Sequence, residues 1–369
     1  MSAVTIELRR RSAPGREPPA GAFGRVQSAL AAIPAPPFAE IFAPVDALRA
    51  KLIRLVAPRF RPLVVDREVR VAAFATFLLC TALVSTSLVP MWFLVVGPLL
   101  WGIPHVVSDL RYLVARPGYH RRPGVAVAVT AGIIAAGLGY TLRAALLGAA
   151  GALLFARTSW RRRLSGIGVL GALYALAAWA GPLSDLVFAH LHNVIAVGFW
   201  WAWRPRTRRL HWLPLALFVL FSALILLGAL DFMVTRVGLH APWTGISARW
   251  LAYQLSPTMS GPWPTRMLVL YAFGQSVHYV VWMRLVPEEE RPSATPRSFA
   301  QSFRALRVDV GSVVLWATTA SIVALLAWGA MSLGAARNGY LQLAFFHGYL
   351  EIAAAALMWA EGRRAGEIG

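Results

Sequence analysis

Residues 101–112 read WGIPHVVSDLRY and lie near the end of an apolar run long enough to cross a lipid bilayer. His105 and Asp109 are four residues apart, so a helix places them on one face, about 40° apart around its axis. An ionisable group costs roughly 2.5–3.5 kcal/mol at the centre of a span, and such groups usually face the interior of a bundle. The stretch therefore predicts a helical membrane fold with a buried polar centre.

The composition of the whole chain is typical of an integral membrane protein. Hydrophobic residues make up 58% of the 369 residues and charged residues only 14%, whereas a soluble protein carries about 25% charged residues. The mean hydropathy is +0.59. Repeated apolar runs of about 20 residues predict an all-α polytopic membrane protein. The single cysteine, Cys80, excludes an intramolecular disulfide and a cysteine-based metal site.

Within residues 69–361, the apolar runs predict a bundle of about ten transmembrane helices. The expected spans are residues 69–88, 90–113, 124–140, 143–157, 163–181, 183–203, 210–230, 263–286, 308–333 and 338–361. Spans three to five are short and rich in glycine and alanine, which leaves open whether all of them cross. If the N-terminus is inside, only five of the 36 Lys and Arg residues fall outside: Arg143, Arg236, Arg249, Arg266 and Arg337.

This distribution of basic residues predicts that both termini are inside, as expected for a multi-pass protein of a bacterial cytoplasmic (inner) membrane. It also accounts for the net charge of +20 without a nucleic-acid partner, because basic residues at the ends of spans favour anionic headgroups.

The segments outside the spans have distinct compositions. Residues 1–43 are rich in Pro, Ala and Arg and predict a disordered cytoplasmic tail. Residues 44–61 predict an amphipathic helix at the membrane interface, with packing on the loops as the alternative. The outer segment 231–262 contains the amphipathic stretch ISARWLAYQL and is a candidate lid, and loop 287–307 is polar and expected to be half helical. The first 60 residues lack the apolar core of a cleavable signal peptide.

Five histidines inside the predicted spans form a candidate metal-binding set: His105, His190, His192, His278 and His347. They lie on spans two, six, eight and ten, which all run from outside to inside, and their depths differ by about 12 Å. His190 and His192 point about 160° apart, so a compact site takes only one of them. Neutral imidazole suits iron, zinc or copper. The alternative is that each histidine hydrogen-bonds between helices.

Two carboxylates accompany these histidines. Asp109 and Glu351 are the only ones of the 16 acidic residues placed deep within spans, and Glu351 follows His347 by four residues. They are expected to accept hydrogen bonds from the imidazoles and fix their tautomers, or to be direct ligands of a two-metal site. Tyr279, beside His278, completes the candidate catalytic residues. Bis-histidine haem ligation by these helices also stays open.

These motifs resemble those of the bacterial Brp/Blh family of membrane β-carotene 15,15′-dioxygenases. GIPHVVSD (102–109) matches the family's GxPHxxxD motif. SVHYVVW (276–282) is similar to a motif with a histidine–aromatic pair followed by tryptophan, and FFHGYLE (345–351) to its last histidine-then-acid motif. The chain departs from the family at HLHNVIAV (190–197), which lacks the expected acid. It also departs in its larger number of predicted spans and in its basic tail.

The resemblance implies Fe(II) held by four histidines, with O2 cleaving a carotenoid-type polyene to retinal-like aldehydes. The lipid-dissolved substrate is expected to reach the histidines through an apolar tunnel from the lipid side, with segment 231–262 as a cap. Aromatic residues that flank the motifs are candidates for substrate stacking, with ordinary packing as the alternative: Trp101, Phe199, Trp282 and Phe346. Two other function classes stay open: a ceramidase-like zinc-dependent lipid hydrolase with Ser108 beside Asp109, and a transporter or haem electron carrier.

Overall fold

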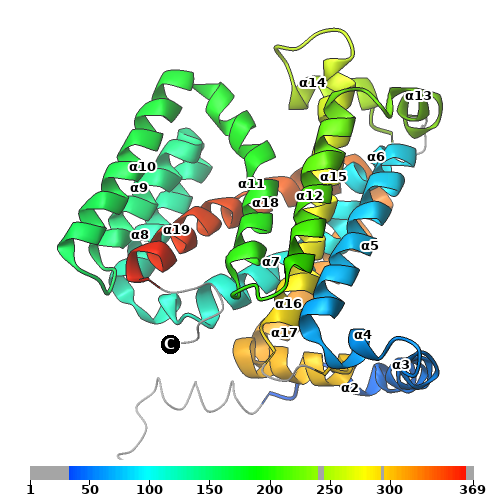
Figure 1. Ribbon diagram of the computed structural model, residues 1–369. Coiled ribbons are helices and arrows are strands. Elements are labelled where there is room, and N and C mark those ends of the chain that lie inside the picture. The colour runs from blue at the N-terminus through cyan, green and yellow to red at the C-terminus, as the bar shows by residue number, and fades with distance from the viewer. Residues whose placement is uncertain (1–32, 240–244, 292–294, 363–369) are drawn as a thin grey trace, which may run out of the picture.

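The computed structural model describes residues 33–239, 245–291 and 295–362, and all regular structure in these ranges is helical (Figure 1). The first half contains α2 (Phe38–Ile41), α3 (Ala43–Val56), α4 (Arg61–Val65), α5 (Arg67–Leu88), α6 (Pro90–Val95), α7 (Gly97–Asp109), η1 (Leu110–Ala115), η2 (Tyr119–Arg121), α8 (Pro123–Ala135), η3 (Ala136–Tyr140), α9 (Thr141–Leu154) and α10 (Trp160–Ala180). The second half contains α11 (Pro182–Ala202), η4 (Arg209–His211), α12 (Trp212–Leu226), α13 (Asp231–Met233), η5 (Val234–Gly238), α14 (Ala248–Leu255), α15 (Trp263–Val280), η7 (Val281–Leu285), α16 (Val286–Glu289), α17 (Phe299–Met331), α18 (Leu333–Ala344) and α19 (Phe346–Glu361).

The chain is an all-α polytopic membrane protein, as the sequence predicts. Among the described residues, six helical stretches are long and apolar enough to cross a membrane: α5, α10, α11, residues 209–226, α17 and residues 333–361. Two shorter apolar helices cover residues 123–139 and 141–154. All ten predicted spans coincide with helices, but those containing α7 and α15 are interrupted and more polar. The count of ten and the orientation of the termini stay predictions.

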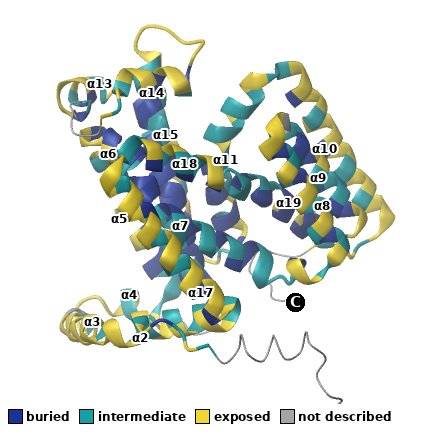
Figure 2. Ribbon diagram, turned by 180° about the vertical axis from the view of Figure 1, so that it is seen from behind, coloured by how far each residue is buried: buried dark blue, intermediate teal, exposed yellow. Residues whose placement is uncertain are grey.

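The helices form two groups that are joined by α19. In the larger group, α15 packs against α5, α6, α7, α11, α12 and α14. In the smaller group, α9 packs between α8 and α10 and also against α19 (Figure 1). Buried residues concentrate on α7, α15 and α19, whereas α10 exposes most of its length (Figure 2). The core therefore lies around α15 and extends along α19 to the smaller group.

The helices that carry the candidate site are irregular. Pro104 lies inside α7 and donates no backbone N–H, and α7 continues after Asp109 as the π-helical η1. The helix α15 likewise continues as the π-helical η7. The predicted span 338–361 is two helices, because α18 ends at Ala344 and α19 begins at Phe346. These interruptions change which backbone carbonyls are available near the site.

The N-terminal region is more ordered than expected near its end. Residues 1–32 of the predicted tail lie outside the described residues, but α2 folds against α17, where the Phe38 ring meets the Phe303 ring edge-on at 5.4 Å. The predicted interfacial helix 44–61 is α3 followed by the separate α4. Exposed apolar side chains line α3: Val45, Leu48, Leu52 and Leu55. This exposure suits a helix that lies on a lipid surface.

Asp46 fastens α3 to the start of α17. Its Oδ1 accepts a hydrogen bond from the Phe299 backbone N–H at 2.6 Å, and its Oδ2 accepts one from Ala300 at 2.9 Å. Desolvation raises the pKa of Asp46, but these backbone hydrogen bonds outweigh it and the pKa is lowered. The stabilisation is therefore complete above the ordinary pKa of aspartate and is lost as the pH falls through the lowered value.

We predict that Asp46→Ala speeds amide hydrogen exchange at Phe299 and Ala300 about fivefold, because a lost helix cap costs about 1 kcal/mol. Hydrogen–deuterium exchange of the purified protein measures this change. Glu40→Ala, which removes an exposed carboxylate from neighbouring α2, is the control and should leave both amides unchanged. Equal exchange in the two variants would contradict the anchoring role of Asp46.

Candidate metal centre

Four histidines from four helices converge inside the bundle. His105 comes from α7, His192 from α11, His278 from α15 and His347 from α19. Their ring centroids are 4.4 Å apart for His192–His278, 4.7 Å for His192–His347 and 4.9 Å for His105–His347. The spans of the sequence prediction therefore bring their histidines to one depth.

His190 does not join this cluster. Its Nε2 donates to the carbonyl oxygen of Leu255 in α14 at 3.1 Å, and its ring meets the Tyr271 ring edge-on. Of the two alternatives on α11, the structure brings His192 to the site. The His190 position is a contact between α11 and the outer segment.

The hydrogen bonds of three histidines determine which ring nitrogen is free. The Nδ1 of His105 lies 3.0 Å from the Trp101 carbonyl oxygen, and the Nδ1 of His347 contacts the Ala344 carbonyl oxygen. A carbonyl only accepts, so each Nδ1 carries the hydrogen and each Nε2 keeps a lone pair. The Nδ1 of His192 lies 3.0 Å from Glu351 Oε2, which assigns the same tautomer.

The Nε2 atoms of His105 and His347 are 3.3 Å apart. Since both Nδ1 atoms hold the ring hydrogens, two lone pairs face each other without a proton between them. Two imidazole nitrogens bound at about 2.1 Å to one tetrahedral metal ion are themselves about 3.4 Å apart. The observed separation thus fits two ligands of a shared ion.

His278 and Asp109 have no other use in the described structure. Neither ring nitrogen of His278 and neither carboxylate oxygen of Asp109 has a hydrogen-bond partner there, although the two residues are 1% and 0% exposed. One ligand atom from each of His105, Asp109, His278 and His347 lies within 4.8 Å of the others. Buried polar groups without partners are costly. A metal ion at this point would satisfy both residues.

Glu351 has a different role from Asp109, although the sequence places both a turn after a histidine. Glu351 Oε2 accepts from His192, and Oε1 accepts from the indole N–H of Trp282 at 2.9 Å. Both of its oxygens are therefore engaged, and the one that accepts from His192 orients a candidate ligand. Asp109 keeps both oxygens for the cluster.

The charge of the donor set also fits a divalent cation. Glu351 and Asp109 are both 0% exposed, and no arginine or lysine forms an ion pair with either among the described residues. Two carboxylates beside four neutral imidazoles carry a charge of −2 when ionised. Uncompensated charge in the membrane interior is expensive, and a dication would neutralise it.

The aromatic candidates separate into two kinds. The Tyr279 ring lies 4.5 Å from the His105 ring, and its hydroxyl accepts from Gln275 Nε2 at 2.7 Å, so Tyr279 lies against the cluster. The Trp101 ring is 6.3 Å from the Tyr279 ring. Trp282 is fully buried and donates to Glu351, the partner of His192, and substrate stacking on its ring stays a prediction.

The other two candidates for substrate stacking flank the site without contacting the histidines. Phe199 is 7% exposed and packs on the Trp282 ring at 5.7 Å. Phe346 is half-buried and starts α19 directly before His347. Phe199 therefore packs in the core, and its contact with a substrate stays a prediction.

Three residues that the sequence did not single out for a role shape the centre. The Tyr340 hydroxyl is buried without a partner in the described structure, and its ring packs against Gly102, where an added Cβ would lie 2.3 Å from it. Glycine in the GIPH motif thus makes room for Tyr340. A Cβ at Gly348 would lie 3.0 Å from the Nδ1 of His192. Gly102 and Gly348 belong to the two motifs that contain His105 and His347, whereas no spacing in the sequence links Tyr340 to the histidines.

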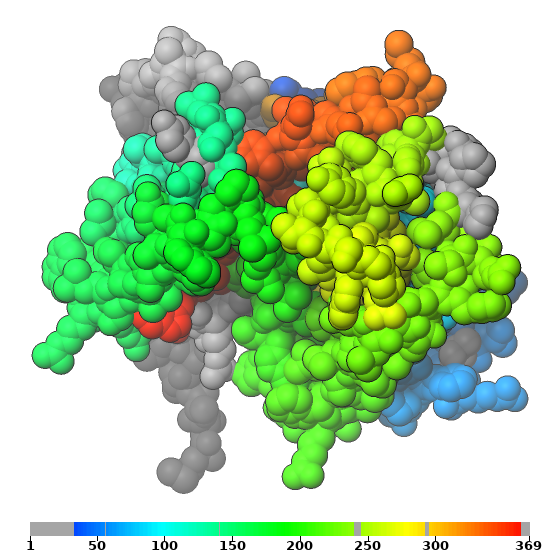
Figure 3. Space-filling model, turned by 90° about the horizontal axis from the view of Figure 1, so that it is seen from above, coloured from blue at the N-terminus to red at the C-terminus, as the bar shows by residue number. Residues whose placement is uncertain are grey.

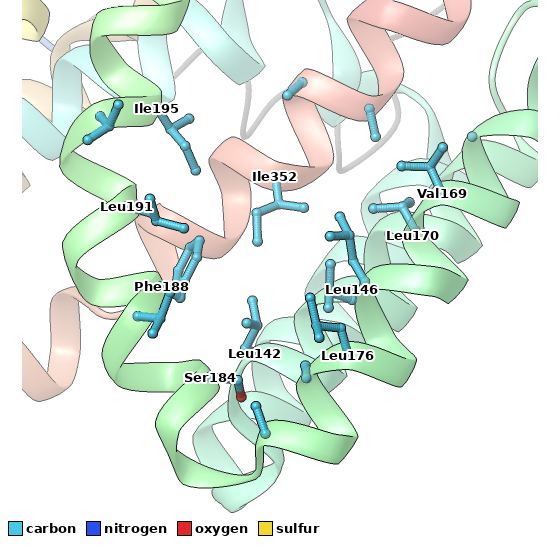
Figure 4. A pocket seen from close by; sticks show the side chains of 18 of the residues that line it. Leu142, Leu146, Val169, Leu170, Leu176, Ser184, Phe188, Leu191, Ile195 and Ile352 are labelled. Carbon is cyan, nitrogen blue, oxygen red and sulfur yellow. The ribbon is translucent and has the colours of Figure 1, made fainter. Parts of the chain in front are cut away.

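An apolar cavity of about 860 Å³ borders the centre, between α9, α10, α11 and α19 (Figure 4). Its wall includes Phe188 and Leu191, which flank His192 on α11, and Ile352, which follows Glu351. The Phe188 ring lies 6.1 Å from the His192 ring, between the cavity and the cluster. Much of the wall is exposed, so the cavity opens to the side of the bundle.

The outer segment does not cap this cavity. No described residue of 231–262 lines it, in contrast to the expected lid. Instead, α14 packs on α15, and the segment forms part of the surface at one end of the molecule (Figure 3).

Comparisons of the chain with protein-family models, curated proteins and solved structures find no match. The resemblance to the Brp/Blh family therefore stays an expectation. Function must be inferred from the geometry of the centre.

We predict that Gly348→Ala weakens metal binding by roughly 10–100-fold, the effect typical of disturbing a residue that orients a ligand. The added methyl group would push His192 away from Glu351. Gly168→Ala is the matched control, because a Cβ there meets nothing within 4 Å. Chelator competition on the purified protein measures the affinity, and equal affinities in the two variants would contradict the role of Gly348.

A second prediction separates the two carboxylates. Asp109→Asn should lower the metal content as much as His105→Ala does, because Asp109 has no hydrogen-bond partner among the described residues and faces the cluster. Glu351→Gln should weaken binding by roughly 10–100-fold without abolishing it. Elemental analysis with chelator titration tests this order. A milder effect for Asp109→Asn than for Glu351→Gln would reverse the two roles.

Proposed function

We propose that the chain is a membrane-embedded non-haem iron oxygenase that acts on an apolar polyene, isoprenoid or other lipid. The observation that carries the proposal is the approach of two lone-pair nitrogens, on His105 and His347, to 3.3 Å within a cluster of four histidines. Imidazole and carboxylate donors suit Fe(II), and Zn(II) is the alternative ion. The resemblance to carotenoid dioxygenases favours iron and an oxidative cleavage.

Bound Fe(II) would supply a coordination position at which O2 reacts with the substrate. His105, His192, His278 and His347 would hold the ion together with Asp109, and Glu351 would keep His192 oriented. In a dioxygenase reaction one C=C bond breaks and each product carbonyl takes one atom of O2, so no reductant is required. Apolar walls such as Phe188 would exclude water from the site.

The side opening of the cavity supports a substrate that arrives from the lipid. Its lining is almost entirely aliphatic and aromatic. Among the described residues that line it, Ser184 is the one with a hydroxyl group. Pockets of this size and character hold drug-sized or larger apolar molecules. The Phe188 ring lines the cavity and lies 6.1 Å from the His192 ring, so a substrate in the cavity would lie beside this histidine.

The other function classes fit less well. Ser108 donates its hydroxyl hydrogen to the Trp282 carbonyl oxygen at 2.6 Å, so it is engaged away from the histidines that a zinc hydrolase would use. The ring centroids of the four histidines are too close together for a planar haem to lie between any two of them. The separations run from 4.4 Å for His192–His278 to 5.8 Å for His278–His347. The break at Phe345 is a second interruption, besides Pro104 in α7, of the kind that transporters use to bind a solute through backbone carbonyls. The Ala344 carbonyl at this break already accepts from His347.

The proposed location is a bacterial cytoplasmic membrane with both termini inside. The concentration of Lys and Arg at alternate ends of the predicted spans supports this location. O2 and the lipid substrate are then both available within the bilayer.

The test is to purify the protein in mild detergent, determine its bound metal and optical spectrum, and supply a carotenoid with O2. We expect about one iron per chain, no haem bands, and O2-dependent formation of aldehydes. His192→Ala should lose the iron and the activity, whereas His190→Ala, two residues away, should keep the iron. Zinc together with lipid hydrolysis, or a haem spectrum, would overturn the proposal.

A further inference from the structure

A separate cluster of arginines surrounds Glu288 at the end of the bundle where α16 and α17 meet. Glu288 Oε1 pairs with Arg70 at 2.6 Å, and Oε2 pairs with Arg284 at 3.0 Å and also with Arg291. Both Glu288 and Arg291 are buried. One carboxylate is thus shared by three guanidinium groups.

The neighbouring acids do not correct this surplus of positive charge. Glu289 pairs with Arg206, and Glu290 pairs with Arg116. Further arginines approach the same point and donate to backbone carbonyls. Arg67 and Arg204 donate to the Arg291 carbonyl oxygen, and Arg49 donates to that of Arg297.

The electrostatics of two residues outside the spans reflect the surplus. Burial and repulsion from neighbouring arginines, Arg284 first among them, lower the pKa of Arg291 to about 9 in spite of its pairing with Glu288. Burial and then repulsion from Arg284 likewise lower the pKa of Arg49. Partly buried positive charge without a matching anion is unfavourable.

The cluster also lies beside surfaces that suit lipid. Arg49 belongs to α3, whose exposed Leu48, Leu52 and Leu55 form an apolar face, and α3 lies across the end of the bundle near α17 (Figure 1). The Arg284 guanidinium lies 4.8 Å over the ring of Phe74, which is 39% exposed on α5. Positive charge and apolar surface therefore meet at one place, as a phospholipid headgroup and its acyl chains require.

We propose that this cluster, formed by Arg49, Arg284 and Arg291 around Glu288, binds the phosphate group of an anionic phospholipid of the adjacent leaflet. Guanidinium groups bind phosphate through charge-assisted, often bidentate hydrogen bonds. The bound lipid would balance the surplus charge and hold α3 and the start of α17 together. This site is independent of what the histidine centre binds.

The experiment compares lipid binding by the full chain in mild detergent. Native mass spectrometry counts retained phospholipid, and thermal unfolding is followed with added phosphatidylglycerol, phosphatidylcholine or inorganic phosphate. We expect phosphatidylglycerol alone to be retained and to raise the unfolding temperature. Arg284→Gln, at a side chain 37% exposed, should weaken this binding roughly tenfold, the effect of one charge-assisted hydrogen bond.

Arg161→Gln is the matched control, because it removes an exposed arginine at the start of α10, away from the cluster. It should leave phosphatidylglycerol binding unchanged. In Glu288→Gln, added phosphatidylglycerol should raise the unfolding temperature by more than in the unaltered protein. The reason is that the substitution removes the carboxylate that Arg70, Arg284 and Arg291 share. Equal losses in Arg161→Gln and Arg284→Gln, equal stabilisation by inorganic phosphate, or no preference over phosphatidylcholine would each overturn the proposal.

Discussion

Two carboxylates that no water can reach constrain the centre of this bundle. Asp109 and Glu351 are completely buried, and the helices that carry them depart from regular geometry around them. A proline precedes His105 in α7, and the break before α19 gives His347 a backbone carbonyl as its acceptor. His105 and His347, through these carbonyls, and His192, through Glu351, each keep the lone pair on Nε2. The irregular backbone occurs where a polar site needs partners that regular helices do not offer.

The larger group of helices holds the buried core, and the apolar cavity lies where the smaller group meets it. Around α15, large side chains such as Phe273 and Trp282 are completely buried, and this region holds the histidines. The smaller group of α8, α9 and α10 meets the rest mainly through α19, and the apolar cavity lies at this junction. Regions with fewer buried contacts open at lower free-energy cost. An apolar molecule that enters from the lipid would therefore do so beside α10 without disturbing the core.

Much of this structure is predictable from local sequence patterns. Apolar periodicity predicts the helices, and the histidine spacings predict that one residue from each of four spans meets the others. The choice of His192 over His190 is not predictable, because it depends on the Leu255 carbonyl, which is 65 residues away. The break at Phe345 also carries no proline or glycine signal. The different uses of Asp109 and Glu351 depend on Trp282, which tertiary packing alone brings to Glu351.

The histidines of the cluster differ in the kind of group that accepts the hydrogen bond from Nδ1. His105 and His347 are held by carbonyl oxygens of their own local backbone, which packing already fixes. The His192 ring lies 6.1 Å from the ring of Phe188, which lines the cavity. Its partner is a carboxylate, and that carboxylate is itself held by Trp282. Charge-assisted hydrogen bonds are stronger than neutral ones. His192 thus depends on a carboxylate from another helix, whereas His105 and His347 depend on carbonyl oxygens of their own local backbone.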